Sequence, residues 1–191
     1  ETIGPSISSE LRRQAFKTGL AVMIGIILYI AYSFRKVSRP VSAWKFGVTA
    51  IIALVHDVII TMGVFVLLGK YADVEVDIPF VVALLTILGY SVNDTIVVFD
   101  RIREKLIRHS SKYFDETVNI AVNETIARSI NTSLTVILTL LALFFFGGAS
   151  IHYFALALII GVFFGTYSSI FVASSLLVSW EAWSRRSKVR L

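Results

Sequence analysis

The sequence predicts an all-α membrane protein with five transmembrane helices, and three observations lead to this prediction. Apolar residues make up 56% of the 191 residues and charged residues only 16%, whereas about a quarter of the residues in a soluble domain are charged. Five apolar runs approach or exceed the ~20 residues that a helix needs to cross the hydrocarbon core. None of them alternates as a barrel strand would, and lipid offers the backbone no hydrogen-bond partner outside a helix.

The five predicted spans are separated by polar connections. They cover residues 15–34, 46–68, 78–99, 130–146 and 153–180. The first run follows a pair of arginines, as a secretion signal does, but it is longer and ends in Arg35-Lys36 instead of a small-residue cleavage site. The fourth run is short, so its helix could begin earlier, within residues 123–129.

The positions of Lys and Arg predict how the spans are oriented. Fourteen of the 18 cations lie in the segments 35–45, 100–129 and 181–191. Because cytoplasmic loops carry an excess of Lys and Arg, we assign these segments to the cytoplasm. The segments assigned to the outer side are 1–14, 69–77 and 147–152. A basic chain can also bind nucleic acid, but cations gathered between apolar runs favour a membrane role, and no nucleic acid is expected.

The connection 100–129 is the largest and predicts a short cytoplasmic helical hairpin. Its second half begins with Asp115 and Glu116, as the first turn of a helix often does. Apolar side chains recur there at helical spacing, namely Phe114, Val118, Ala121 and Val122. We expect both halves to continue the third and fourth spans. The alternative is a solvated linker that lies on lipid headgroups.

Asn93 and Asp94 lie inside the third predicted span. An ionised carboxylate in hydrocarbon costs roughly 2.5–3.5 kcal/mol on insertion scales, so it needs a partner, a water-filled cavity or a proton. Asp94 and Arg128 both lie roughly 24–27 Å from the outer ends of their helices, at 1.5 Å per residue. We therefore predict Arg128 as the cationic partner of Asp94.

The predicted pair suggests a mechanism. Burial raises the pKa of a carboxyl group and a nearby cation lowers it, so a movement of Arg128 would bind or release a proton at Asp94. Asn93 is a supporting residue. The alternative is a static buried ion pair or an inter-helix hydrogen bond.

Two further sets of polar residues could support this site. Thr132 and Thr135 continue the face of Arg128 at i+4 and i+7, where hydroxyls could order water; the alternative is that they bond to their own backbone. His56 and Asp57 lie in the middle of the second span. Asp57 could be a second relay carboxylate, but structural support is the preferred interpretation.

The remaining features predict packing and exclude some chemistry. Small residues at every fourth position of the last span form a seam for close helix approach, namely Gly161, Gly165, Ser169 and Ala173. The chain has no cysteine, and His56 has no second ligand at i+3 or i+4, so neither a metal nor a cofactor is expected.

Sixteen consecutive residues carry a resemblance to a known family. From Gly89 to Glu104 they read Gly-Tyr-Ser-Val-Asn-Asp-Thr-Ile-Val-Val-Phe-Asp-Arg-Ile-Arg-Glu. This run resembles the signature of the SecF branch of the SecD/SecF protein-export family, which belongs to the resistance-nodulation-division superfamily. The similarity extends over nearly the whole chain and includes His56-Asp57-Val58, Asn123-Glu124-Thr125 through Arg128, and Phe146-Gly147-Gly148.

The resemblance implies half of a helical bundle of this superfamily, which uses the proton-motive force to help draw polypeptides across the bacterial inner membrane. Asp94 and Arg128 would then be the proton-conducting residues. The partners that it implies are SecD, the SecYEG translocon, YajC, exported preproteins and membrane lipid. The amino terminus would be periplasmic and the carboxyl terminus cytoplasmic. The family pattern has a preceding span and a periplasmic domain, so we expect this chain to be a fragment or part of something longer.

Three alternatives to an export subunit remain. The first is a proton-coupled exporter of lipids or small molecules from the same superfamily. The second is an intramembrane aspartic protease with paired carboxylates; Ser91-Val92-Asn93-Asp94 stands where that class has Gly-x-Gly-Asp, so we do not expect an enzyme. The third is a purely structural scaffold, in which Asp94 and Asp57 would be freely replaceable.

Overall fold

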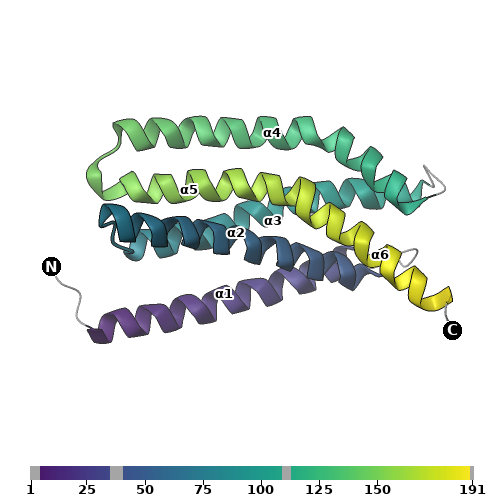
Figure 1. Cartoon of the computed structure of the whole chain (residues 1–191), viewed down its shortest axis with the longest axis horizontal. Helices are drawn as coiled ribbons and strands as arrows, with labels where there is room; N and C mark the ends of the chain where they lie inside the picture. The colour runs from purple at the N-terminus through teal and green to yellow at the C-terminus, as the bar shows by residue number, and fades with distance from the viewer. Residues whose placement is uncertain (1–4, 35–40, 109–112, 190–191) are drawn as a thin grey trace.

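The computed structural model describes residues 5–34, 41–108 and 113–189, and the statements below concern these residues. They form helices and no strand, which confirms the predicted all-α class. The helices are α1 (Pro5–Ser33), α2 (Ala43–Ala72), α3 (Ile78–Ile107), α4 (Phe114–Phe146) and a last long helix composed of α5 (Ala149–Tyr167), η1 (Ser168–Ala173) and α6 (Ser174–Val189) (Figure 1). Parts of the predicted segments 1–14, 35–45, 100–129 and 181–191 lie outside the described residues.

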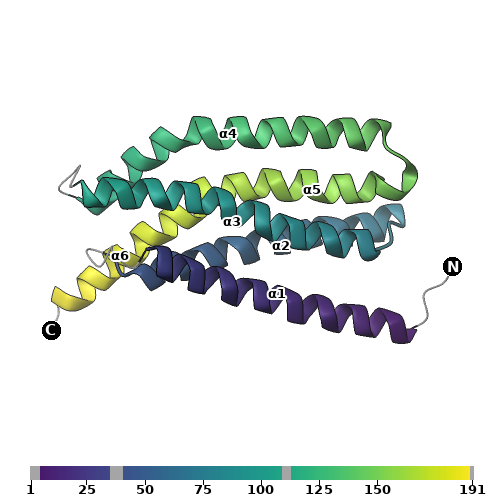
Figure 2. The same cartoon turned by 180° about the vertical axis from the view of Figure 1, so that it is seen from behind.

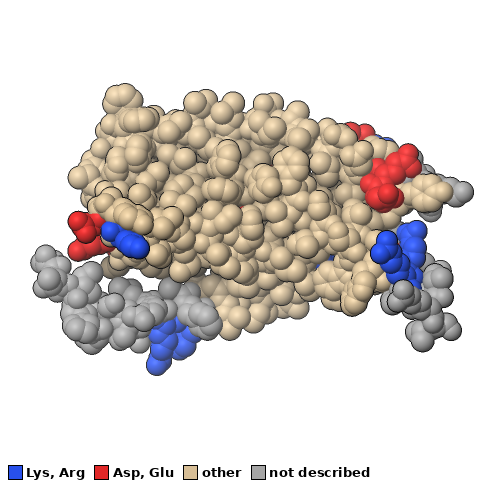
Figure 3. Space-filling view, viewed as in Figure 1, with Lys and Arg blue, Asp and Glu red and all other residues tan. Residues whose placement is uncertain are grey.

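Four of these helices are long and apolar enough to cross a membrane: α2, α3, α4 and the last helix from Ala149 to Arg186. In α1 the described apolar stretch, Lys17–Ser33, is shorter than in the other four. On the face drawn in Figure 3 the charged residues gather at the two ends of the molecule, with an uncharged band between them. The chain is therefore a multi-pass membrane protein.

The helices run up and down side by side, with α1 and α4 at opposite edges of the bundle (Figures 1 and 2). The middle is formed by α2, α3 and α5, and α3 packs against both α4 and α5. One part of the core is a cluster of three rings, in which Phe46 lies 5.0 Å from Phe34 and 5.2 Å from Phe99 between centroids. Phe34 directly follows α1, Phe46 lies in the first turn of α2 and Phe99 lies within α3, so the three rings hold these helices together.

Two tight turns join neighbouring helices at the end of the bundle that we predict to be periplasmic. Asp73 ends α2 in the left-handed conformation with a φ of 50°, and the Asp77 carboxylate accepts a hydrogen bond from the backbone N–H of Phe80 at 3.0 Å to begin α3. At the next turn His152 Nδ1 donates to the carbonyl oxygen of Phe144 at 3.0 Å, and the two rings stack. These contacts satisfy backbone groups that helix ends leave without partners.

At the opposite end α3 and α4 extend beyond their apolar runs and form the helical hairpin that the sequence predicts. Glu124 of α4 accepts hydrogen bonds from Lys105 Nζ and Arg101 Nε of α3, both at 2.6 Å. The hydrogen bond from Lys105, together with that from Arg101, holds the pKa of Glu124 below its usual value. Glu124 therefore stays ionised and joins the two helices.

The last helix bends where α5 meets α6, so that α6 leaves the line of α5 (Figure 1). The bend coincides with η1, which is π-helical, and such segments are an established cause of helix kinks. Beyond the bend α6 docks on the first turn of α2, where Lys45 Nζ donates to Ser184 Oγ at 2.8 Å and lies 3.6 Å from Glu181.

Candidate functional site

Asp94 is buried in the middle of α3, where it is 7% exposed. Its Oδ1 accepts a hydrogen bond from Ser129 Oγ of α4 at 2.6 Å. Its Oδ2 is also buried and has no hydrogen-bond partner among the described residues. An ionised carboxylate with an unpartnered oxygen is costly in such a place, so the geometry suits a group that carries a proton or that waits for another partner.

Arg128 does not lie against Asp94, contrary to the ion pair that the sequence predicts. Its side chain is exposed, and no ion pair within 4 Å joins it to Asp94 in the described part of the chain. Consecutive residues on an α-helix point about 100° apart. Since Ser129 faces α3 and bonds to Asp94, its neighbour Arg128 faces away from the bundle.

Thr132 and Thr135 lie on the same outer face of α4 as Arg128. Both are exposed, and each hydroxyl donates to its own helix, Thr132 to the carbonyl of Arg128 at 2.9 Å and Thr135 to that of Thr132 at 2.8 Å. The same holds for Thr139, which donates to Thr135. The arrangement is thus a polar stripe on the surface of the bundle rather than a path through its interior.

Asn93 is exposed as well, although it precedes Asp94 directly. Neighbouring residues of α3 point about 100° apart, so Asp94 faces the interior of the bundle while Asn93 faces outward. The two members of this pair therefore face different surroundings, and Asn93 makes no contact with the carboxyl group of Asp94 that would support it directly.

Asp57 is the second buried carboxylate, and none of its surface is exposed. Its Oδ2 accepts hydrogen bonds from Ser91 Oγ of α3 at 2.5 Å and from Ser168 Oγ of η1 at 2.7 Å. Its Oδ1 lies 3.0 Å from Nδ1 of His56, whose side chain is 32% exposed. The predicted pair His56–Asp57 is thus joined to two other helices.

Hydroxyl groups that make hydrogen bonds between helices fill the space beside the two carboxylates; among them only Ser169 belongs to a predicted feature, the small-residue seam. Thr95 and Ser169 share a hydrogen bond of 2.9 Å across α3 and η1, Ser133 of α4 bonds to Thr166 of α5, and Tyr90 donates to Ser133 at 3.0 Å. The signal in the sequence is that these hydroxyls stand at i±3 or i±4 from one another or from a carboxylate, inside apolar runs.

The predicted seam of small residues lies against α3. A Cβ added at Gly161 would come within 2.3 Å of the Ile87 side chain, and one at Gly165 within 3.1 Å of Ser91 Cβ. Ser169 and Ala173 continue the seam and are completely buried. The close approach at Gly165 brings Ser91 near α5 and η1, so the seam positions one of the donors to Asp57.

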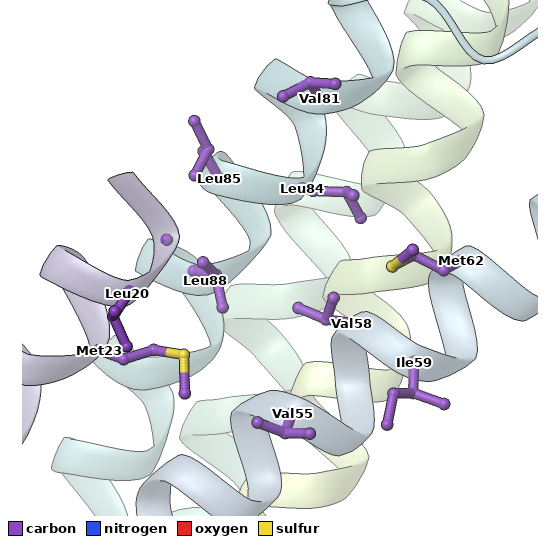
Figure 4. A pocket seen from close by; sticks show the side chains of 11 residues that line it. Leu20, Met23, Val55, Val58, Ile59, Met62, Val81, Leu84, Leu85 and Leu88 are labelled. Atoms are coloured by element: carbon purple, nitrogen blue, oxygen red, sulfur yellow. The ribbon is translucent and has the colours of Figure 1, made fainter. Parts of the chain in front are cut away.

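An apolar groove of about 450 Å³ lies between α1, α2 and α3. Figure 4 shows side chains from all three helices around it, among them Leu20, Met62 and Leu85. It is lined by aliphatic and methionine side chains and glycine, so it offers no group that binds a proton. In the part of the chain that the structure describes, no three His, Asp or Glu side chains gather in a way that could hold a metal ion.

Comparison with known proteins gives a consistent result. Residues 1–183 match the family described as "Protein export membrane protein SecD/SecF, C-terminal". The chain is 53% identical over 180 residues to the protein translocase subunit SecF of Thermobaculum terrenum, covering 94% of this chain and 56% of that protein. It is 49% identical to the protein translocase subunit SecDF of Thermus thermophilus, covering 95% of this chain and 23% of that protein.

A solved structure shows the same fold. The crystal structure of SecDF in a super-membrane-facing form superposes with a TM-score of 0.82 at 45% sequence identity, and the match covers 98% of this chain and 23% of the SecDF chain. The present chain therefore spans about half the length of the SecF relative and about a quarter of SecDF. The match over residues 1–183 and the identity to these relatives show that the chain belongs to the SecD/SecF protein-export membrane family.

Proposed function

We propose that this chain is the membrane part of a Sec protein-export subunit that couples proton flow to polypeptide translocation across the bacterial inner membrane. The proposal rests on the surroundings of Asp94. Among the described residues, this buried carboxylate has one oxygen without a hydrogen-bond partner and no cation within ion-pair distance. The names of its relatives, which are protein translocase subunits, support the export role.

The proposed cycle alternates between two ways of avoiding an uncompensated negative charge at Asp94. In the first way Oδ2 carries a proton while Ser129 holds Oδ1 in place. In the second way the proton leaves, and a cation, for which Arg128 is the candidate, takes over after α4 has turned or shifted. Each charge that crosses the membrane supplies about 2.3 kcal/mol per 100 mV, which is enough for one or a few protons to drive a movement of a few kcal/mol.

The surface of α4 supports SecD as a partner of this cycle. Only 11% of the apolar stretch of α4 is buried, against 56% of that in the last helix, and the exposed face carries Arg128 and Thr132. Charged and polar side chains at membrane depth face a protein partner or water rather than lipid. We propose that SecD covers this face and that the assembled complex contacts SecYEG, YajC and preproteins. We also propose that the amino end is periplasmic.

The test replaces Asp94 by asparagine in the full-length protein and measures export into membrane vesicles with and without a proton gradient. We expect Asp94→Asn to lose the part of export that depends on the gradient while the protein still inserts and assembles. Asp100→Asn is the matched control, because Asp100 is an exposed carboxylate on the same helix that pairs with Arg103 at 3.2 Å. Gradient-dependent export at the wild-type rate in Asp94→Asn would show that Asp94 is not the carrier.

A further inference from the structure

His56 and Asp57 form a second buried polar centre, which the proposed cycle does not use. The carboxylate receives its hydrogen bonds from three elements: from Ser91 of α3, from Ser168 of η1 and from His56 of α2 itself. Each of its two oxygens is engaged, in contrast to Asp94. The carboxyl group is therefore held in one place and can exchange a proton without a rearrangement of its neighbours.

The charge of this centre depends on one proton. His56 is the only titratable group that faces Asp57: α3 and η1 contribute serine hydroxyls, and no Lys or Arg of the described residues lies within 4 Å of the carboxylate. A lone buried carboxylate is costly. The pair is neutral either as imidazolium and carboxylate or as imidazole and carboxylic acid, since both forms hold one proton more than a neutral imidazole beside a carboxylate.

His56 also connects the closed centre to the outside of the bundle. Asp57 has no exposed surface, but the His56 side chain is 32% exposed. Its Nδ1 faces Asp57, and its Nε2 has no hydrogen-bond partner among the described residues. A proton bound at Nε2 can thus be balanced by release of the Nδ1 proton to Oδ1 of Asp57, which leaves a neutral imidazole and a carboxylic acid.

The π-helical segment η1 joins this centre to Asp94. Ser168 donates to Asp57, and the next residue, Ser169, shares a hydrogen bond with Thr95, the residue that follows Asp94 in α3. One peptide unit therefore separates the donor to Asp57 from the residue that bonds to the chain neighbour of Asp94. Single π-helical turns within α-helices occur frequently at functional sites, and this one lies where both centres meet the last helix.

We infer that His56 and Asp57 form a second proton-binding site, in which His56 takes up the proton and Asp57 holds it, and that η1 couples this site to Asp94. The inference deepens the proposed function and rests on it for the role of the site in transport. Proton binding by the pair, however, is measurable without any transport. It also replaces the interpretation of Asp57 as structural support alone.

Infrared difference spectroscopy after a pH step tests this inference in the full-length protein in lipid vesicles. The carbonyl stretch of a protonated carboxyl group reports its proton directly. We expect one component of the protonated-carboxyl signal to be lost in Asp57→Asn and a different component in Asp94→Asn. Thr49→Val is the matched control, since Thr49 is a fully buried polar residue of α2 that bonds only to backbone carbonyls, and it should keep both signals.

The outcomes separate the two proposals. A pH-step spectrum of Asp57→Asn that superposes on the wild type overturns the second site, whatever the result at Asp94. His56→Gln keeps a donor for Asp57 and should change the pH range over which the Asp57 signal appears; an unchanged range contradicts the role of His56. If circular dichroism shows that Asp57→Asn does not fold, the pH range of the Asp57 signal in His56→Gln becomes the test of the second site. Normal gradient-dependent export in Asp94→Asn would overturn the proposed function alone.

Discussion

The hydroxyl of Ser129 donates a hydrogen bond to Oδ1 of Asp94 from the facing helix α4. A serine hydroxyl can donate to an ionised carboxylate and can equally accept from a protonated one. The guanidinium of Arg128, one residue away, can only donate, so it is a partner for the ionised carboxylate alone. Ser129 therefore suits a carboxyl group that changes its protonation, because it remains a hydrogen-bond partner in both forms.

Replacing this hydroxyl should lower stability. Ser129→Ala removes the donor to Oδ1 of Asp94, and leaving a buried acceptor unsatisfied costs about 1–3 kcal/mol. We expect the free energy of unfolding to fall by that amount, as measured by denaturant titration in detergent. Ser129→Thr retains the hydroxyl and should restore most of the loss. An alanine variant as stable as the wild type would mean that the hydrogen bond contributes nothing net.

Arg128 should behave as a charge and not as a packing residue. Because its side chain is exposed, we expect neither Arg128→Lys nor Arg128→Met to change the unfolding midpoint by much. Gradient-dependent export should survive in part with Lys and be lost with Met, since only Lys retains the positive charge. Export in vesicles measures this, and full activity of the Met variant would remove Arg128 from the proposed cycle.

The sequence predicts the two carboxylates of the site but not their partners. Asp94 and Asp57 are conspicuous because each is an acidic residue in a long apolar run. The predicted pairing of Asp94 with Arg128 rests on equal depth in the membrane. Depth does not determine which side of α4 faces α3, and in the structure the next residue, Ser129, faces Asp94 in place of Arg128. The donors Ser91 and Ser168 are distant in the sequence from Asp57, so only the packing of α2, α3 and η1 brings them together.

Among the helices, α4 and the last helix differ most in their surroundings. The last helix is enclosed by the bundle, whereas most of α4 is exposed. The difference follows from side-chain size, because glycines on α5 let α3 approach closely, and Ile87 fills the space above Gly161. Small residues are a common basis of helix packing in membranes, where burial of apolar surface from water gives little driving force.

A methyl group at Gly161 should separate the two central helices. The added Cβ would lie 2.3 Å from the Ile87 side chain, which is itself buried. We expect Gly161→Ala to lower the free energy of unfolding by about 1–3 kcal/mol, the usual cost of overpacking. The double variant Gly161→Ala with Ile87→Val should recover part of it. Gly63→Ala on α2 is the control, since a Cβ there meets nothing within 4 Å.

The helices themselves follow from the sequence better than their ends do. Each apolar run predicts one helix because lipid leaves no other way to satisfy the backbone. The polar residues beyond a run carry no such requirement, and so the continuation of α3 to Ile107 depends on contacts such as that between Lys105 and Glu124. The segment η1 contains neither Pro nor Gly, and no local pattern in the sequence marks it.

For the molecule as a whole, the exposed face of α4 is where a partner is expected. The chain covers 56% of its SecF relative and 23% of SecDF, so those proteins have further parts that can lie against this face. Three aromatic residues, Phe145, Phe146 and Tyr153, are exposed at the turn between α4 and α5, where we expect one membrane surface. Tyr in particular is typical of the interface between lipid and water.

The absence of cysteine from the chain makes this face easy to probe. A cysteine at Thr139, on the exposed stripe of α4, should form a disulfide with cysteines placed along a facing SecD helix. A cysteine at Val66, on the exposed face of α2, is the control and should form none with the same helix. The yield after mild oxidation is read from a non-reducing gel. Equal yields at both positions would mean that α4 is not the specific contact.

One property of the last helix explains how its inward residues stay inward. Gly161, Gly165, Ser169, Ala173, Leu177 and Glu181 follow one another at every fourth position, and all are buried. On a regular α-helix such a series drifts by about 40° at each step, because four residues exceed a turn of 3.6. By Glu181 the series would have moved round to the opposite side. The longer i→i+5 loops of η1 take up more residues per turn, so this segment offsets part of the drift before the helix reaches Glu181, which lies 3.6 Å from Lys45.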